Sequence, residues 1–187
     1  SYPYLASNIY KKGVKPAERA QFPNVFPSKI FKVGRVMVGV IGLSTLDTPK
    51  TTRPENVSGY DFESLAQNTI REAQSLRQRG AQVIAITSHV GLKCARGKVA
   101  SSYRIRSAED STGACDEQDE MVRLLRELPR GTVDAVVAGH SHTIVHHWIA
   151  GVPVIQGAAY GRCANVIYLT YDLVKATPVP ASARTER

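Results

Sequence analysis

Two stretches of the sequence are alike: VIAITSHVGL at residues 83–92 and DAVVAGHSHT at residues 134–143. Each is a short run of small and branched apolar residues that leads into a turn with histidine. Continuous apolar runs of this length are typical of strands buried on both faces, as in a parallel sheet. We therefore expect two buried strands whose carboxyl ends carry the histidines.

A helix is predicted before the first of these strands. Apolar residues recur at helical spacing over residues 61–79, with Asp61 as a suitable N-cap and Gly80 where a C-terminal glycine belongs. Residues 36–43 are apolar at nearly every position, which predicts another buried strand upstream. The order strand, helix, strand implies a right-handed parallel crossover.

The remaining elements make the predicted fold an α/β fold with a mixed sheet. A second helix is expected at residues 116–128, where acidic residues load the first turn and Pro129 ends the pattern. Residues 175–187 are rich in proline, alanine and charge, and we expect a tail or linker there. The antiparallel strands are predicted at residues 30–33, paired with residues 36–43 across Gly34-Arg35, and at residues 144–149, 152–156 and 163–171.

The composition is that of one folded domain. The chain has 187 residues, of which 43% are hydrophobic and 21% charged, and this mix argues against disorder or a fibrous repeat. No apolar run approaches the roughly 20 residues that cross a membrane, so no membrane span is expected. Ser1 rather than methionine opens the chain, so we expect a processed or excised piece of a longer protein.

The net charge favours an anionic partner. Lysine and arginine number 24 against 16 acids, which gives a formal net charge of +8, and five of these cations lie between Lys93 and Arg106 with no acid among them. Such a balance suits phosphate compounds or other anions, although an inert basic surface is equally consistent. The aromatic residues do not interleave with the basic ones, so no specific nucleic-acid binding is expected.

The three cysteines are Cys94, Cys115 and Cys163. None lies in a C-x-x-C pair, so no zinc knuckle is expected. A bridge between Cys94 and Cys115 would close a loop of about 20 residues, worth about 3 kcal/mol in the chain-entropy model. It would suit an oxidising compartment. A pair of free thiols is the alternative, and the count alone leaves both open.

Three histidines are candidate metal ligands: His89, His140 and His142. In open α/β sheets ligands bind outside the carboxyl ends of the strands, which is where these histidines are expected. Neutral imidazole is the commonest metal ligand, and it suits Zn, Fe, Ni, Cu and, with added carboxylates, Mn. Two more, His146 and His147, lie on the next predicted strand with side chains on opposite faces, and we interpret them as surface or core residues.

These motifs resemble the last two metal-binding motifs of the calcineurin-like metallophosphoesterases, and the 5'-nucleotidase and UDP-sugar hydrolase branch is the most similar. The two motifs are Ser88-His89-Val90-Gly91 and the stretch from Asp134 to Thr143. Other stretches agree with that branch, in order, up to about Asp172. They are Tyr2 to Ile9, Val38 to Leu43, Gly59 to Phe62, Gly151 to Gly157 and Tyr160-Gly161-Arg162.

The resemblance implies part of a layered α/β-β/α sandwich that hydrolyses phosphate esters, nucleotides or related compounds, with two divalent metal ions (Mn, Zn, Fe or similar). Residues 1–174 would be the C-terminal portion of the catalytic domain. By this match His89 and His140 would bind one metal and His142 the other, and no catalytic residue of the family falls within the chain. The branch is usually exported, which implies an extracytoplasmic (periplasmic or secreted) location.

The chain also departs from the family pattern. The Asp-x-His, Gly-Asp-x-x-Asp and Gly-Asn-His motifs are absent, and with them a bridging carboxylate and a catalytic histidine. The chain alone is therefore expected to be inactive and to need the missing N-terminal half of the domain as a partner. The alternatives are a non-catalytic fragment that binds one metal or an anion, and an intact basic adaptor domain whose histidines are structural.

Overall fold

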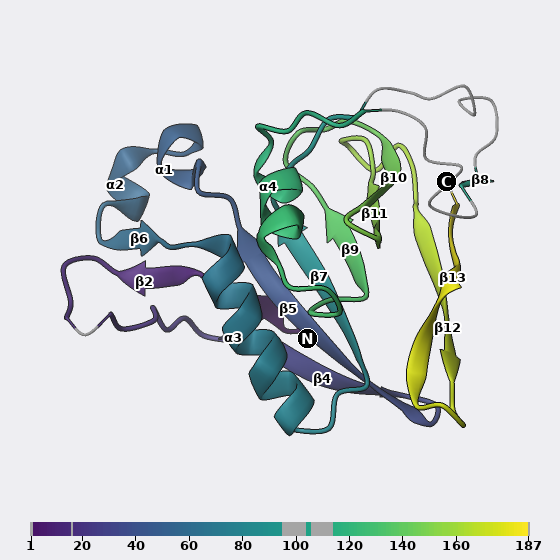
Figure 1. Cartoon of the computed structure of the whole chain (residues 1–187). Helices are drawn as coiled ribbons and strands as arrows, with labels where there is room; N and C mark the ends of the chain where they lie inside the picture. Colours follow the sequence, from purple (N-terminus) through teal and green to yellow (C-terminus); the bar gives the residue numbers. More distant parts are fainter. Residues whose placement is uncertain (1, 16, 95–103, 106–113, 187) are drawn as a thin grey trace.

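The computed structural model describes residues 2–15, 17–94, 104–105 and 114–186, and Figure 1 shows its arrangement. A six-stranded sheet forms its centre. The four inner strands run parallel, and the two edge strands are antiparallel to their neighbours. In spatial order the strands are β10 (Val145–Ile149), β11 (Val152–Gln156), β9 (Ala135–Ala138), β7 (Val83–His89), β5 (Val36–Ser44) and β4 (Ser28–Val33). The prediction of an α/β fold with a mixed sheet is confirmed.

Short elements surround this sheet. The helices are α1 (Thr48–Thr51), α2 (Pro54–Val57), α3 (Leu65–Gln78) and α4 (Glu120–Glu127). The small sheets pair β1 (Tyr4–Leu5) with β3 (Val25–Phe26), β2 (Ile9–Lys11) with β6 (Tyr60–Phe62), and β13 (Thr177–Glu186) with both β12 (Val166–Asp172) and β8 (Arg104–Ile105). No helix among the described residues is long and apolar enough to cross a membrane.

Helix α3 begins later than the sequence pattern predicts. Asp61, predicted as the N-cap, lies instead in β6, opposite Tyr10 of β2. The cap is Ser64, whose hydroxyl accepts a hydrogen bond from the backbone N–H of Gln67. Because Tyr60–Phe62 pairs as a strand, the helix begins at Leu65 instead of directly after Asp61. The other end agrees with the prediction, because Gly80 follows the helix with a φ of +90°.

Two other boundaries were also predicted wrongly. Helix α4 begins at Glu120 rather than at residue 116, because Asp119 has an extended backbone, with φ −66° and ψ 138°, and therefore caps the helix instead of continuing it. The segment predicted as a frayed tail forms strand β13, which pairs with β12. The hairpin across Gly34-Arg35 is confirmed, with β4 and β5 antiparallel on either side.

Helices α3 and α4 lie against one face of the central sheet (Figure 1). The side chains on this face include Ile41, Ile84, Ile86 and Val136, and all four have 0% exposure. Helix α3 approaches β5 closely because Gly39 has no side chain: a Cβ there would lie 2.9 Å from the Leu76 side chain. The core therefore lies between this face and the helices.

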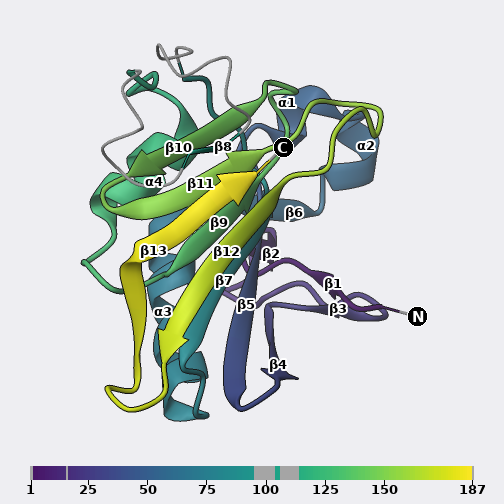
Figure 2. The ribbon, with the colours of Figure 1, turned by 90° about the vertical axis from the view of Figure 1, so that its right-hand side faces the viewer.

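The opposite face is only partly covered. The β12–β13 hairpin lies on this side, where it contacts β11 (Figure 2), and Leu5 packs over Gly42. Between these, Thr87 is exposed and Val137 is 46% exposed. The two residues are register partners on neighbouring parallel strands, so they share this face. The inner strands of a parallel sheet are normally covered on both faces, so an apolar part of the sheet is left open here.

Candidate functional site

The histidine pair lies at one edge of the sheet. His89 is the last residue of β7, and His140 follows β9, the parallel neighbour of β7, after a single glycine. Parallel strands end at the same edge, so the topology brings the two histidines side by side. The prediction that they lie together is confirmed: Nε2 of His89 and Nδ1 of His140 are 3.2 Å apart.

Two glycines allow the loops that carry these histidines to approach closely. A Cβ on Gly91 would lie 2.9 Å from the backbone nitrogen of Ser141, and a Cβ on Gly139 would lie 3.1 Å from the carbonyl oxygen of Ser88. The backbone N–H of Gly139 also donates to the carbonyl of Val90. A side chain at Gly91 would therefore push the two histidine motifs apart, and one at Gly139 would make a tight contact with Ser88.

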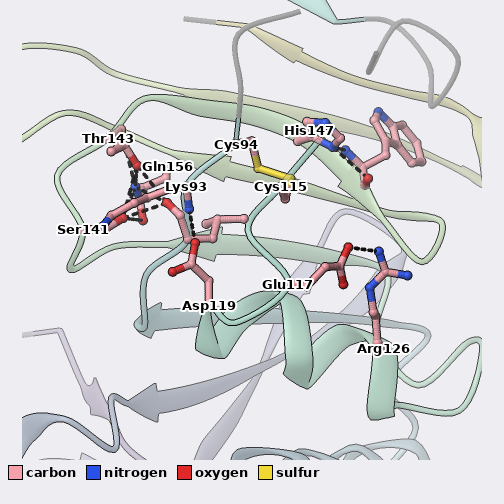
Figure 3. Close-up of a disulfide and its surroundings, with 12 residues drawn as sticks. Lys93, Cys94, Cys115, Glu117, Asp119, Arg126, Ser141, Thr143, His147 and Gln156 are labelled. Carbon is pink, nitrogen blue, oxygen red and sulfur yellow. Dashed lines mark hydrogen bonds and ion pairs between the residues drawn. A yellow bond between two sulfur atoms is a disulfide. The ribbon is translucent and has the colours of Figure 1, made fainter. Parts of the chain in front are cut away.

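A buried glutamine holds the two histidine-bearing loops together. Gln156 has 0% exposure, and its amide nitrogen donates to the carbonyl and hydroxyl of Thr143 and to the hydroxyl of Ser141. The hydroxyls of Ser141 and Thr143 each donate to the carbonyl of Leu92 at 2.8 Å. Figure 3 shows this cluster. It joins the end of β11 to both histidine-bearing loops.

The surroundings of His89 favour its neutral form. Its partial burial lowers the pKa of the imidazole below the ordinary value, and His140 and His142 lower the pKa further because a second positive charge there would be repelled. A neutral imidazole keeps a lone pair on one ring nitrogen, which is the form that binds a metal.

The spacing of the pair fits two ligands of one ion. Metal–nitrogen bonds of about 2.0–2.1 Å at a tetrahedral angle place two ligand nitrogens about 3.3 Å apart, close to the 3.2 Å seen between His89 and His140. Structural and catalytic sites use three or four protein ligands. Among the described residues no third histidine, cysteine or carboxylate joins this pair within 4.8 Å. The pair therefore fits half of a metal site.

His142 is not part of this pair. It lies two residues after His140, and both have a positive φ, 57° and 75°. Its ring contacts Tyr160 instead, with the ring centroids 6.1 Å apart. This separation is compatible with the interpretation that His142 serves a second ion, and its role as a ligand remains a prediction.

A cleft of about 670 Å³ opens beside His140. Its wall carries both signs of charge, and each acid has a donor. Glu120 accepts from the hydroxyl of Thr45 and the N–H of Leu46, and Asp119 accepts from the N–H of Lys93 (Figure 3). Lys50 donates to Asp47 and lowers the pKa of that carboxyl. The remaining lining includes Arg123, Gln118 and Ser141.

The structure resolves the question of the cysteines. Cys94 and Cys115 form a disulfide, and Cys163 is a free thiol. The sulfurs lie near His147, as Figure 3 shows, but a disulfide offers no thiolate to a metal. His147 is buried, and His146 contacts Asn165 with a nitrogen–oxygen distance of 2.7 Å, in agreement with the interpretation of both as core or surface residues.

Part of the predicted basic run is not described by the structure, and two residues near the site were not predicted individually. Most of the basic run after Lys93 lies outside the described residues, at positions 95–103 and 106. Gln156 and Tyr160 were not singled out as individual residues by the sequence pattern. The available signal was an isolated polar residue at the end of the apolar run Val152 to Ile155, for which a buried amide is a natural interpretation.

The sequence has relatives among extracellular and nucleotide-related proteins. No family model matches it. It is 25% identical over 174 residues to the cell wall protein Lmo0130 of Listeria monocytogenes, and this alignment covers 92% of this chain and 20% of that protein. It is 30% identical over 144 residues to the 5'-nucleotidase of Vibrio cholerae, and this alignment covers 75% of this chain and 22% of the relative. The chain therefore spans about a fifth of the length of these relatives.

A solved structure shows the same fold. The calcineurin-like phosphoesterase YfkN from Bacillus subtilis superposes with a TM-score of 0.73 at 14% sequence identity. The match covers 100% of this chain and 55% of that protein. At this identity the similarity establishes the fold alone.

Proposed function

Because this chain is a relative of the 5'-nucleotidases and has the calcineurin-like phosphoesterase fold, we propose that it carries one side of the active site of a metal-dependent phosphoester hydrolase. The observation that carries the proposal is the 3.2 Å contact between His89 and His140 at the carboxyl edge of parallel strands. A chain whose homology covers part of a nucleotidase would contribute only some of the ligands.

The uncovered part of the sheet supports this division of the site. Side chains alternate along a strand, so His89 continues the same face as Thr87, which is exposed. Val137 lies beside it on β9 and is 46% exposed. The histidine pair, which offers too few ligands for a metal site, therefore lies beside the incompletely covered face of the sheet. One body of additional polypeptide, the N-terminal half of the catalytic domain, would supply both.

The residues of this chain would act as ligands and as their supports. His89 and His140 would each offer a ring nitrogen to one ion and His142 would offer its ring to a second, while Gln156 and the two loop glycines fix the loops. The chemistry that two divalent ions supply in such a site is neutralisation of the phosphate charge and activation of a water molecule. We expect Mn, Zn, Fe or a similar metal, since imidazole suits these ions.

The substrate and location follow from the relatives as proposals. The name of the Vibrio relative favours a nucleotide or a similar phosphate ester. The name of the Listeria relative places that protein in the cell wall, and the Cys94–Cys115 disulfide suits an oxidising compartment. We propose an extracytoplasmic protein.

The test replaces His140 in the complete protein that contains this chain. His140 has a φ of +75°, so His140→Gly removes the imidazole without straining the backbone, and His146→Ala is the matched control. We expect His140→Gly to lose at least one bound metal by atomic spectroscopy and to abolish phosphate release from nucleoside monophosphates, while His146→Ala keeps both. Full activity and full metal content in His140→Gly would refute the proposal.

One observation favours a second function. Among the described residues no carboxylate joins His89 and His140, and two imidazoles without a carboxylate do not neutralise two divalent ions. The alternative is therefore a non-catalytic module that binds one metal or an anion. A complete protein that binds a single ion and releases no phosphate would establish this alternative.

A further inference from the structure

A tyrosine beside His142 has an unusual backbone and an unusual exposure. Tyr160 lies in the loop between β11 and β12, has a φ of +63° and leaves 86% of its surface exposed. A left-handed backbone is rare for a bulky aromatic residue. Such strained conformations gather at functional sites, where the surrounding structure maintains them. With so much of its surface exposed, the ring fills no space in the core of the described residues, which points to a role at the site.

The ring joins a candidate metal ligand to an arginine. The edge of Tyr160 meets the ring of His142, with centroids 6.1 Å apart and an interplanar angle of 60°. The guanidinium carbon of Arg162 lies 5.6 Å from the centroid of the same ring. His142 and Arg162 therefore contact the same tyrosine ring, which places a positive charge near the candidate metal ligand.

Arg162 has its hydrogen-bond donors available. The side chain is exposed, and within the described part of the chain it takes part in no ion pair and no hydrogen bond. The contact with the Tyr160 ring is a cation–π interaction and uses none of the guanidinium's hydrogen-bond donors. The planar N–H groups of a guanidinium match the oxygens of a phosphate. The cations of the cleft beside His140 differ, because that wall also holds Asp47, Asp119 and Glu120.

We propose that Arg162 binds a phosphate oxygen of the substrate at the His142 end of the site, and that Tyr160 is a positioning residue that holds the guanidinium there. This inference rests on the proposed function for the identity of the substrate as a phosphate ester. It adds a residue that recognises the negative charge; the resemblance includes the stretch Tyr160-Gly161-Arg162 but assigns no role to Arg162.

The experiment uses the complete protein loaded with Mn²⁺ and measures the dissociation constant of inorganic phosphate. Arg162→Ala should weaken phosphate binding about tenfold to hundredfold, the value of a lost charge-assisted hydrogen bond. Arg162→Lys should recover only part of the loss, because lysine lacks the planar donor pair. The matched control is Arg35→Ala, an exposed arginine in the β4–β5 turn, which should change the constant less than twofold.

Tyr160 is tested by two substitutions. Tyr160→Phe keeps the ring and should bind phosphate like the wild type. Tyr160→Gly removes the ring and suits the positive φ, so it should weaken phosphate binding severalfold without lowering the melting temperature. A Tyr160→Gly protein that binds phosphate as tightly as the wild type would overturn the positioning role.

Steady-state kinetics distinguishes a failure of the inference about Arg162 from a failure of the proposed function. With a nucleoside monophosphate as substrate, Arg162→Ala should raise KM with little change in kcat and with unchanged metal content, as for loss of uniform binding. If the wild type hydrolyses the substrate and Arg162→Ala binds phosphate like Arg35→Ala, the inference is wrong and the proposed function stands. If the wild type binds phosphate through Arg162 but hydrolyses no phosphate ester, the proposed function fails and Arg162 remains an anion-binding residue. A wild type that binds no phosphate overturns the inference.

Discussion

Three side chains at the histidine edge of the sheet are held on left-handed backbone. His140, His142 and Tyr160 have φ values of 75°, 57° and 63°. Each such residue costs about 1–2 kcal/mol relative to the usual backbone, so the fold must stabilise them elsewhere. Beside His140 and His142, the stabilising contacts are the hydrogen bond from the buried amide of Gln156 to Ser141 and the close packing of Gly91 on Ser141. The site is thus maintained by residues that carry no chemistry themselves.

The close packing predicts a large effect from one methyl group. In Gly91→Ala the new Cβ would lie 2.9 Å from the backbone nitrogen of Ser141, so the loop of His140 must move. We expect a loss of about 1–3 kcal/mol in the free energy of unfolding and weaker metal binding. Urea denaturation followed by circular dichroism, together with metal content, measures both.

The control for this substitution is Gly59→Ala. A Cβ on Gly59 meets nothing within 4 Å, so the change should stay within about 0.5 kcal/mol. Equal stability of the two variants would show that the two histidine loops yield easily, contrary to the packing described here.

At the scale of elements, the disulfide anchors the segment that follows the first histidine. Cys94 lies two residues after Leu92, whose carbonyl accepts hydrogen bonds from Ser141 and Thr143, and the bridge ties it to Cys115, ahead of helix α4. Replacing both cysteines by serine should lower the free energy of unfolding by about 3 kcal/mol. Thermal unfolding of Cys163→Ala, which lacks only the free thiol, provides the comparison. An unchanged melting temperature in the double serine variant would show that the hydrogen bonds alone hold this segment.

The elements also show what the sequence could predict. The apolar runs predicted β5, β7 and β9 as buried parallel strands, because a covered sheet demands apolar residues at nearly every position. The start of α3 was missed because Asp61 pairs with Tyr10, a contact between segments far apart in sequence. Strand β13 was missed for a related reason: proline, alanine and charge predict a frayed end, and its pairing with β12 depends on tertiary structure.

The candidate site was predictable to the same degree. His89 and His140 could be placed together because strand order and the carboxyl-edge rule depend on topology. Their supports could be predicted only in part: the sequence marks Gln156 as a polar residue at the end of an apolar run, but its partners Leu92 and Thr143 come within reach only in the folded chain. Tyr160 was quoted only as part of a motif, and its positive φ is visible only in three dimensions.

At the scale of the whole molecule, the two faces of the central sheet differ in cover. The helical face is closed, with Ile84 and Val136 at 0% exposure, whereas Val137 on the other face is 46% exposed. The open region adjoins His89, which with His140 offers two of the three or four ligands that the proposed metal site needs. Under the proposed function, a single further body of polypeptide would both cover this face and supply the remaining ligands.

This requirement can be measured with two valines. Val137 and Val174 are both exposed in this structure, at 46% and 95%, and a surface substitution should change stability by no more than about 0.5 kcal/mol. If further polypeptide covers the open face, Val137→Lys buries an unpaired charge in the complete protein, and we expect a loss of more than about 2 kcal/mol. Val174→Lys, on the β12–β13 turn, should remain neutral. Since the covering body would also bring the remaining ligands, Val137→Lys should lower metal content together with stability. If the two lysine variants are equally stable and equally loaded with metal, the open face is a true surface, and the histidine pair must find its other ligands elsewhere.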